Sequence, residues 1–251
     1  MLNESKSARN PSRKIADALL SVLLAPTCAA CERPLDEPTG RPVCGACWTS
    51  IKSFTPPLCQ TCGDPLPSWR DVGPDVSRCP RCRRGNHVVS QSRAIGEYDG
   101  SLREIVHALK YAGHRSLARP LAHLMARSGA SVLAGADAAV PVPLHRSKKR
   151  QRGFNQAAEI ARHLPIEVIH MLKRIRATAS QTDLPAEARQ ANVHNAFAMR
   201  RGVRVKGSVI VLIDDVSTTG ATVEACARVL LAAGAREVRA LTAARVVSRS
   251  R

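Results

Sequence analysis

The stretch 209–222 constrains the fold more than any other part of this chain. It begins with five apolar, mostly β-branched residues, a pattern typical of a buried strand in a parallel sheet. Asp214 and Asp215 follow at the expected carboxyl end of that strand, where ligands bind in open α/β sheets. A hydroxyl-rich loop closed by Gly220 then leads into a helix pattern that ends at Gly234. This order predicts an α/β fold with a ligand site at the end of the strand.

The loop after the acidic pair has the chemistry of a phosphate site. Backbone N–H groups of a loop and a helix N-terminus can surround a phosphate, and the helix dipole favours its charge. Gly220 permits close approach, while Ser217, Thr218 and Thr219 add hydroxyl donors. The carboxylates would repel that phosphate, so we expect them to face sugar hydroxyls or a hydrated Mg²⁺ ion. The stretch therefore predicts a ribose-5-phosphate site; the simpler alternative is a strand, an ordinary Asp-Asp turn and a Thr-rich helix cap.

Cysteine spacing predicts a second, metal-dependent region. Eight of the nine cysteines form four C-x-x-C pairs: Cys28/Cys31, Cys44/Cys47, Cys59/Cys62 and Cys79/Cys82. Such spacing is typical of metal sites rather than of disulfides, and the segment has too little apolar periodicity to fold unaided. Four thiolates suit tetrahedral Zn²⁺, which gives two structural sites. Sequential and interleaved pairings both remain open, and we expect the ninth cysteine, Cys226, in the core.

The charge balance indicates polyanionic partners. The net charge of +18 and the pI of about 10.5 suit nucleic acid, nucleotide or pyrophosphate, although a basic surface can also serve solubility alone. Aromatic residues make up only 3%, so DNA binding would use mainly backbone phosphates and depend strongly on salt. The apolar run 15–24 is too short for a membrane span. We expect an amphipathic helix packed on the metal-binding region; a targeting peptide or peripheral membrane contact is the alternative.

The remaining chain alternates between strand and helix patterns. Strands are expected at 93–98, 138–142, 166–170, 172–176 and 237–246, and helices at 102–109, 117–128 and 153–163. We expect the basic run 146–152 to form a loop beyond the strand 138–142, where it could meet pyrophosphate oxygens or simply be solvated. The long polar excursion 177–197, helix-like over 186–195, is expected to form a lid.

Several motifs together resemble known families. The stretch 209–222 resembles the phosphoribosyl pyrophosphate (PRPP) motif of type I phosphoribosyltransferases. The whole chain resembles the ComF family, which includes the GntX-type proteins. The resemblance rests on the order of four features: the cysteine pairs, the turn 140–143, the run Arg-Gly-Phe-Asn-Gln at 152–156 and this motif. The segments 109–114 and 181–192 match as well, so the resemblance covers about 19–246. Relatives often carry Tyr where this chain has Ser217, a change that leaves the backbone N–H unaffected.

The resemblance implies a fold and a domain order. The fold is α/β, a type I phosphoribosyltransferase-like parallel sheet with flanking helices, preceded by a small N-terminal zinc-ribbon domain. The expected domains are a basic tail with a short amphipathic helix at 1–27, a double zinc ribbon at 28–83 and the phosphoribosyltransferase-like domain at 93–251.

Site residues also follow from the resemblance. Asp214 and Asp215, the candidate catalytic residues, contact the ribose 2′ and 3′ hydroxyls, with Mg²⁺ accompanying PRPP. The 5′-phosphate loop comprises Val216, Ser217, Thr218, Thr219, Gly220, Ala221 and Thr222. Candidates for neutralising the leaving pyrophosphate are Lys110, Arg146 and Lys148.

The implied role is DNA uptake for bacterial transformation by a PRPP-binding protein. Phosphoribosyl transfer is favoured, with an acceptor that the sequence does not identify. The first alternative is a non-catalytic protein that handles single-stranded DNA and in which PRPP is regulatory or vestigial; the second is a nucleobase-salvage enzyme. Expected partners are PRPP, single-stranded DNA and a helicase-like translocation protein, in the cytoplasm or at the inner face of the membrane, with no transmembrane segment.

Overall fold

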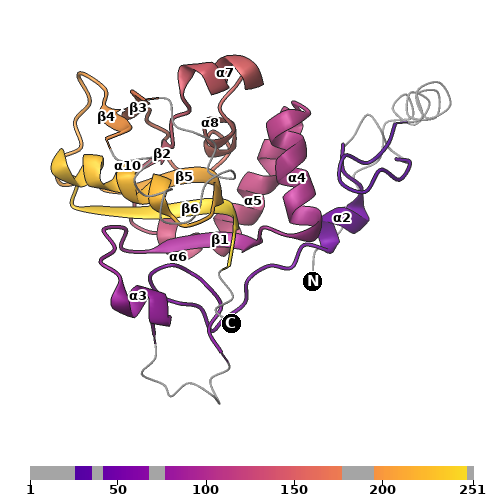
Figure 1. Cartoon of the computed structure of the whole chain (residues 1–251), viewed down its shortest axis with the longest axis horizontal. Helices are drawn as coiled ribbons and strands as arrows, with labels where there is room; N and C mark the ends of the chain where they lie inside the picture. The colour runs from indigo at the N-terminus through magenta and orange to yellow at the C-terminus, as the bar shows by residue number, and fades with distance from the viewer. Residues whose placement is uncertain (1–25, 36–41, 68–76, 177–194, 248–251) are drawn as a thin grey trace.

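Four parallel strands form the central sheet in the order β1-β6-β5-β2 (Figure 1). The computed structural model describes residues 26–35, 42–67, 77–176 and 195–247. The strands are β1 (Ser92–Glu97), β2 (Ala138–Pro141), β5 (Val209–Ser217) and β6 (Glu237–Arg245). The buried strands β5 and β6 occupy the centre because both of their faces are covered, as their near-continuous apolar runs require.

Helices cover both faces of this sheet, and alternate strand residues supply each face. One face packs beneath α4 (Gly100–Tyr111), α5 (Ala118–Ser128), the short α6 (Ala130–Leu133) and α8 (Gln156–Ala161). Val211 and Ile213 lie in that cluster, whereas Ile210 and Leu212 lie in the cluster beneath α10 (Ala221–Ala232). The two-residue period of the strand therefore builds two apolar layers around one sheet.

A small antiparallel pair extends the layer that contains α10. The strands β3 (Leu172–Arg174) and β4 (Phe197–Met199) pair with each other, and Leu172 and Phe197 join the apolar cluster of α10. Val168 forms a parallel bridge to Ala139 at the outer side of β2. The pair thus lies near the carboxyl end of β5 without joining the central sheet.

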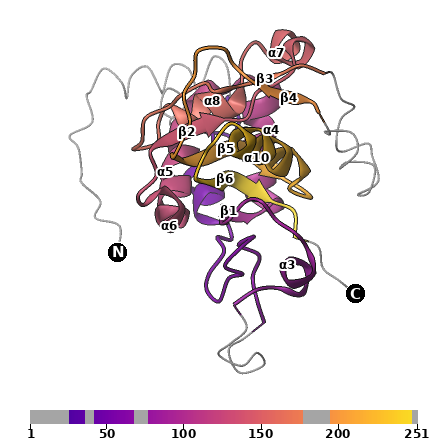
Figure 2. The same cartoon turned by 90° about the vertical axis from the view of Figure 1, so that its left-hand side faces the viewer.

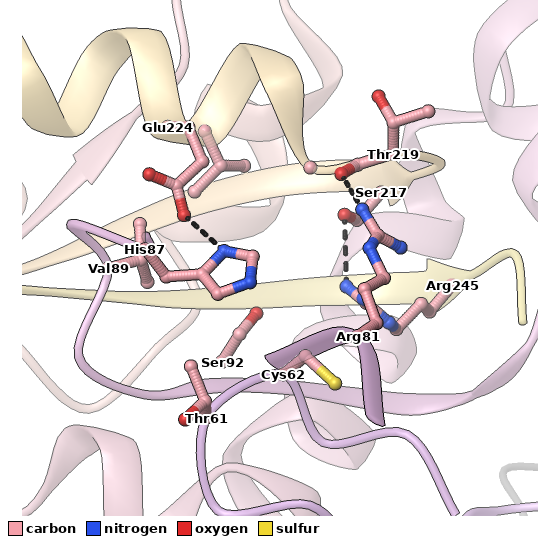
Figure 3. A pocket seen from close by; sticks show the side chains of 12 residues that line it. Thr61, Cys62, Arg81, His87, Val89, Ser92, Ser217, Thr219, Glu224 and Arg245 are labelled. Atoms are coloured by element: carbon pink, nitrogen blue, oxygen red, sulfur yellow. Dashed lines mark hydrogen bonds and ion pairs between the residues drawn. The ribbon is translucent and has the colours of Figure 1, made fainter. Parts of the chain in front are cut away.

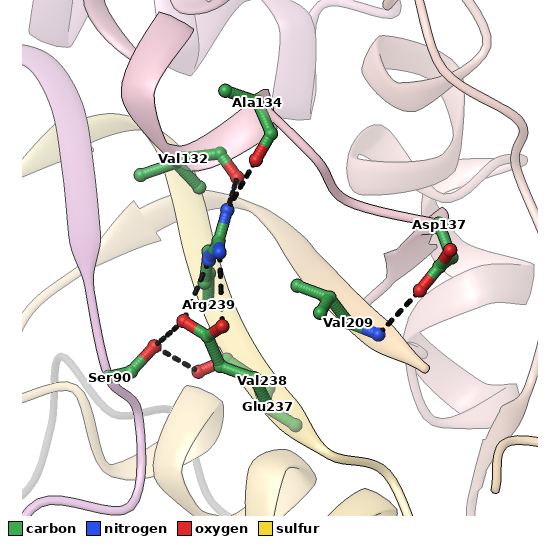
Figure 4. A network of polar contacts seen from close by, with 8 residues as sticks. All are labelled: Ser90, Val132, Ala134, Asp137, Val209, Glu237, Val238 and Arg239. Atoms are coloured by element: carbon green, nitrogen blue, oxygen red, sulfur yellow. Dashed lines mark hydrogen bonds and ion pairs between the residues drawn. The ribbon is translucent and has the colours of Figure 1, made fainter. Parts of the chain in front are cut away.

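A polar network fastens the amino end of the sheet (Figure 4). Arg239 pairs with Glu237 at 2.8 Å and donates to the carbonyl oxygens of Val132 and Ala134, which end α6. The hydrogen bond from Arg239 and a second one from a serine lower the pKa of Glu237 to about 2. Asp137 accepts a 2.7 Å hydrogen bond from the N–H of Val209. These contacts satisfy backbone groups at the end opposite to the predicted site.

Two cysteine-containing regions lie on different sides of the sheet (Figures 1 and 2). We call residues 26–35 and 42–50 the first ribbon and residues 57–67 and 77–85 the second ribbon. The first contains α2 (Gly45–Thr49), which lies beside α4; the second contains α3 (Pro80–Arg84), which lies below β1 and β6.

The segment between the ribbons runs along the outer side of β1. Phe54 donates its N–H to the carbonyl of Ile95 at 2.8 Å, and Ser53 forms an antiparallel bridge with Gly96. A side chain at Gly96 would meet the carbonyl oxygen of Lys52 at 2.2 Å, so only glycine permits this approach. Further along, Ser92 donates its N–H to the second ribbon.

Most expected elements are confirmed, with four differences. The expected strand 166–170 is wrong: it is reduced to the single bridge between Val168 and Ala139. The predicted basic loop 146–152 is wrong: it forms the helix α7 (Arg146–Arg152), capped by His145 and ended by the left-handed Gly153. The following helix is shorter than expected because Asn155 caps it, accepting from the N–H of Ala157 at 3.0 Å. Strand β5 continues through both aspartates to Ser217.

Two expectations fall outside the described residues. They are the amphipathic helix at 15–24 and most of the lid at 177–197. Among the residues that the structure does describe, no helix is both long and apolar enough to cross a membrane.

Candidate functional site

The acidic pair occupies the carboxyl end of β5, in the centre of the sheet. Asp214 and Asp215 are consecutive strand residues, so the pleat directs their side chains to opposite faces. Each carboxylate then meets a cation from a different element. Asp215 faces Lys110 on α4, and Asp214 lies in the field of Arg174 on β3.

The Lys110–Asp215 ion pair is well shielded. The Nζ atom lies 2.9 Å from Oδ1, with side-chain exposures of 13% and 12%. Burial alone would lower the pKa of Lys110, but the carboxylates of Asp215 and Asp214 more than offset this, so its pKa lies above the ordinary value. A permanently charged ammonium therefore accompanies the acidic pair.

Asp214 has a less favourable environment for its charge. Burial, followed by repulsion from Asp215, raises the pKa of Asp214 to about 7. Lys110, Arg174 and a 2.9 Å hydrogen bond from the N–H of Asp215 oppose this rise. Near neutral pH this carboxyl group can thus accept hydrogen bonds when ionised or donate one when protonated.

The loop after β5 turns into α10 at a left-handed glycine. Gly220 has φ +81°, a left-handed conformation that favours glycine, and it directly precedes α10. A side chain at Gly220 would meet no atom within 4 Å, so the space beside it is open. The twelve-residue helix directs its N-terminal N–H groups and its dipole toward this loop. The hydroxyl of Ser217, in contrast, lies toward Arg245, at 3.4 Å from its Nη1 atom.

The predicted pyrophosphate contacts lie on two different elements. Lys110 lies on α4 against the acidic pair, whereas Arg146 and Lys148 lie on α7, which follows β2. Helix α7 carries five basic residues among its seven and buries none of them. At its end, Arg152 stacks over the ring of Tyr111 at 4.9 Å, which joins α7 to α4.

The eight paired cysteines gather into two clusters, and the pairing is sequential. The first comprises Cys28, Cys31, Cys44 and Cys47, and the second comprises Cys59, Cys62, Cys79 and Cys82. In each, all sulfur atoms lie within 4.8 Å of one another, and none forms a disulfide.

Sulfur separations test whether zinc fits these clusters. The pairs Cys28–Cys47, Cys31–Cys44 and Cys62–Cys79 have Sγ–Sγ distances of 3.9, 3.8 and 3.7 Å. A tetrahedral ion with Zn–S bonds of about 2.3 Å requires a separation of roughly 3.8 Å. Backbone N–H groups also point at the sulfurs, for example Cys79 N to Cys59 Sγ at 3.3 Å. Both clusters fit structural Zn²⁺ with four thiolate ligands.

Several residues near the loop had escaped the sequence reasoning. Arg81 of the second ribbon donates to the carbonyl of Thr219, and Arg245 of β6 pairs with Asp64 of the second ribbon. Arg245 offered one signal, since a charged residue ends an otherwise apolar strand pattern. Arg81 and Asp64 offered none, because their partners lie far away in the sequence.

Two family models match successive regions of the chain. A double zinc ribbon domain model matches residues 19–83, and a phosphoribosyl transferase domain model matches residues 150–250. Among solved structures, an allosteric regulatory enzyme of purine biosynthesis aligns with 51% of this chain and 25% of its own, at 24% identity and a TM-score of 0.34. A hypoxanthine phosphoribosyltransferase from Staphylococcus aureus aligns with 51% of this chain and 62% of its own, at 11% identity and a TM-score of 0.31.

Sequence relatives cover most of the chain. The DNA utilization protein YhgH of Salmonella typhi is 32% identical over 207 residues, which is 78% of this chain and 87% of the relative. Competence protein F of Haemophilus influenzae is 29% identical, with the same coverage. Competence protein ComFC of Bacillus subtilis is 27% identical over 76% of this chain and 79% of the relative. With the cysteine clusters and the parallel sheet, these relatives show that the chain belongs to the ComF family of competence proteins.

Proposed function

We propose that this protein binds PRPP together with Mg²⁺ and transfers its phosphoribosyl group during the use of incoming DNA. One observation carries the proposal: the acidic pair at the end of β5 is followed directly by the left-handed Gly220 and the start of α10. It supports the proposal because carboxylates can accept hydrogen bonds from ribose hydroxyls, and the N–H groups at a helix start suit a phosphate. The family provides the DNA-related context.

The proposed reaction needs positioning rather than a protein nucleophile. The bond from the anomeric carbon to the pyrophosphate oxygen breaks, and its electron pair leaves with the pyrophosphate. A nucleophilic atom of the acceptor bonds to that carbon and releases its proton to solvent. Asp214 and Asp215 orient the ribose and stabilise the positive charge that develops on the ring. Mg²⁺, when bound with PRPP, neutralises part of the pyrophosphate charge.

Cations of this chain fit the charges of that reaction. Lys110 compensates the acidic pair before the ligand binds, which limits the cost of holding two adjacent carboxylates. Arg146 and Lys148 lie on α7, beyond the carboxyl end of the neighbouring β2, where leaving pyrophosphate would meet them. The loop 216–222 holds the 5′-phosphate.

A second candidate function is single-stranded DNA handling without turnover. The basic helix α7 and the net charge of +18 favour it. Tyr111 adds an aromatic surface, since its side chain is 61% exposed beside Arg152. PRPP would then act as a regulator. A helicase-like partner, and a cytoplasmic location at the inner face of the membrane, belong to either version of the proposal.

Calorimetric titration of PRPP with Mg²⁺ tests the first candidate. We expect wild-type protein to bind and Asp214→Asn/Asp215→Asn protein to bind at least about tenfold more weakly, since two charged acceptors are removed. Glu104→Gln is the matched control, because its exposed carboxylate pairs with a surface arginine away from the acidic pair.

The same samples separate the two candidates. Release of pyrophosphate in the presence of nucleobases or nucleosides would support transfer. If PRPP binds without turnover, while a fluorescent oligodeoxynucleotide binds with strong salt dependence, the second candidate stands instead. Failure of PRPP to bind wild-type protein would remove both the transferase and the regulatory site.

A further inference from the structure

The second ribbon touches the phosphate loop directly, whereas the first ribbon lies beside α4 (Figures 1 and 3). Polar contacts join the second ribbon and the chain that follows it to three places: the loop, the end of β6 and the first turn of α10. A small pocket lies between these elements, lined by Arg81, His87, Thr219 and Glu224 among others. Two of these contacts use Arg81 and Asp64, which lie within or next to the C-x-x-C turns of the second ribbon.

Arg81 makes the contact with the loop. It lies on α3 between Cys79 and Cys82, two members of the second cluster, so the metal-binding turn determines where its side chain starts. Its Nη2 atom donates a hydrogen bond of 2.5 Å to the carbonyl oxygen of Thr219 (Figure 3). A charged donor on a backbone carbonyl is among the stronger hydrogen bonds in proteins.

This bond determines the orientation of one peptide group. In a planar trans peptide, the carbonyl of Thr219 and the N–H of Gly220 point in opposite directions. Because Arg81 holds the carbonyl toward the second ribbon, the N–H of Gly220 is directed away from that ribbon. Gly220 itself is conformationally permissive, so the loop needs an external contact to favour one orientation.

Two further contacts brace the same region. Arg245, only 5% exposed, pairs with Asp64 of the second ribbon and lies 3.4 Å from the hydroxyl of Ser217. Glu224, in the first turn of α10, accepts from the N–H of Val88 at 3.1 Å and contacts His87 at 3.2 Å. The chain on both sides of the loop is therefore fastened to residues in or next to the second ribbon.

We propose that Arg81 is a positioning residue for the phosphate loop, and that the second ribbon acts through it as a brace for PRPP binding. The inference rests on the proposed function, because it assigns a role to the ribbon at that same site. Arg81 acts through the peptide group between Thr219 and Gly220 and does not itself contact the ligand. Occupancy of the second cluster by zinc, which holds α3 in place, thereby becomes a condition for a preformed loop.

Arg81→Met is the decisive variant, since it keeps the aliphatic stem and removes every donor. Arg84→Met is its matched control, because Arg84 lies on the same helix and is exposed. We expect Arg81→Met to weaken PRPP binding about tenfold in calorimetry, as the loss of one charged hydrogen bond predicts. The control should stay within about twofold of wild type. Both proteins should retain two zinc ions and the wild-type melting temperature.

Hydrogen exchange of the free protein gives a readout that does not depend on PRPP. Amides of residues 217–221 should exchange faster in Arg81→Met than in wild type or Arg84→Met, with the rest of the sheet unchanged. Unchanged exchange in that segment would overturn the proposal even if affinity fell, since Arg81 would then act on the ligand by charge alone. If wild type fails to bind PRPP, the proposed function is wrong, and faster exchange would still support the brace.

A second variant covers the case in which Arg81→Met loses zinc. Arg81→Lys keeps the charge and one donor group. Its loop exchange rates and its PRPP affinity should therefore lie between those of wild type and those of Arg81→Met. Wild-type behaviour of a zinc-loaded Arg81→Met protein in both measurements would exclude a positioning role.

Discussion

The two ribbons bind metal with the same set of ligands but join the rest of the molecule in different ways. Cys28, Leu35, Val43 and Cys47 of the first ribbon belong to the same apolar cluster as the buried faces of α4 and α5. Among the described residues, the cysteines of the second ribbon form a separate cluster with Leu66 packed against it. The second ribbon reaches the sheet through charged and polar groups instead: Arg81, Asp64 and the carbonyl of Thr61.

The two kinds of contact predict different effects, one on the stability of the fold and the other on the geometry of the phosphate loop. Apolar burial contributes free energy without direction, so the first ribbon is expected to act mainly as an extension of the core. Hydrogen bonds and ion pairs contribute less net free energy but fix the orientation of the groups they join. The second ribbon is therefore expected to matter more for the geometry of the phosphate loop than for the stability of the sheet.

Removing one zinc site at a time should produce the largest contrast. Each double variant, Cys28→Ser/Cys31→Ser and Cys59→Ser/Cys62→Ser, should retain one zinc ion by metal analysis. We expect the first to lower the melting temperature more, because it removes part of the shared core. We expect the second to weaken PRPP binding more than tenfold, because it releases Arg81 and Asp64 together. Equal losses of affinity in the two proteins would break the comparison.

The buried ion pair between β6 and the second ribbon should give the next largest effect. Asp64→Asn leaves the Arg245 guanidinium buried without its counter-charge, and we expect a loss of about 3–5 kcal/mol in the free energy of unfolding in urea. Glu104→Gln breaks an ion pair in which the side chains of Arg103 and Glu104 are 56% and 40% exposed. This variant should lower the free energy of unfolding by less than about 1 kcal/mol. A loss below 1 kcal/mol for Asp64→Asn would show that this pair is not a structural link.

A pH titration should separate the acidic pair from both ribbons. Burial and Asp215 raise the pKa of Asp214 to about 7 in the folded protein, against roughly 3.9 when unfolded. The native state thus holds this proton more tightly, so stability should fall as pH rises toward 7, by up to about 1.4 kcal/mol per pH unit, and level off above it. Asp214→Asn should flatten this slope in urea unfolding at pH 5 to 7, and Arg81→Met should keep it. An unchanged slope in Asp214→Asn would assign the titration to another group.

An exposed contact between the first ribbon and α4 should have the smallest effect of these changes. Ser50 and Ser101 share a hydrogen bond of 2.7 Å at an exposed position. Ser101→Ala should change the free energy of unfolding by less than about 1 kcal/mol, since water replaces the lost partner. PRPP affinity should stay the same. A tenfold change in affinity would show that the first ribbon also communicates with the site.

Local patterns predicted much of this molecule. One continuous stretch contains the strand 209–213, the acidic pair, Gly220 and the helix after it. The pattern of neighbouring residues was therefore enough to predict this strand, turn and helix. The four C-x-x-C pairs are equally local, although only the structure shows that they combine sequentially. The implied boundaries of the domains at 28–83 and 93–251 stay predictions.

Contacts between distant segments could not be predicted in the same way. Asp64 and Arg245 are 181 residues apart, and each is an ordinary charged residue in its own surroundings. Helix α7 was missed for a different reason. Arg, Lys and Gln are good helix formers, and Gly153 marks a helix end, but the dense charge suggested a loop.

The segment between the ribbons has a consequence for how other chains can approach. Backbone groups of Phe54, and of Thr61 in the adjoining second ribbon, occupy hydrogen-bonding positions along the outer side of β1. Val168 does the same beside β2. Unpaired strand margins invite a foreign strand to join a sheet. In the part of the chain described, this protein covers both margins with its own backbone. A protein or nucleic-acid partner is therefore expected to recognise side-chain surfaces such as α7, and copies of the chain are protected from assembling through continuous sheets.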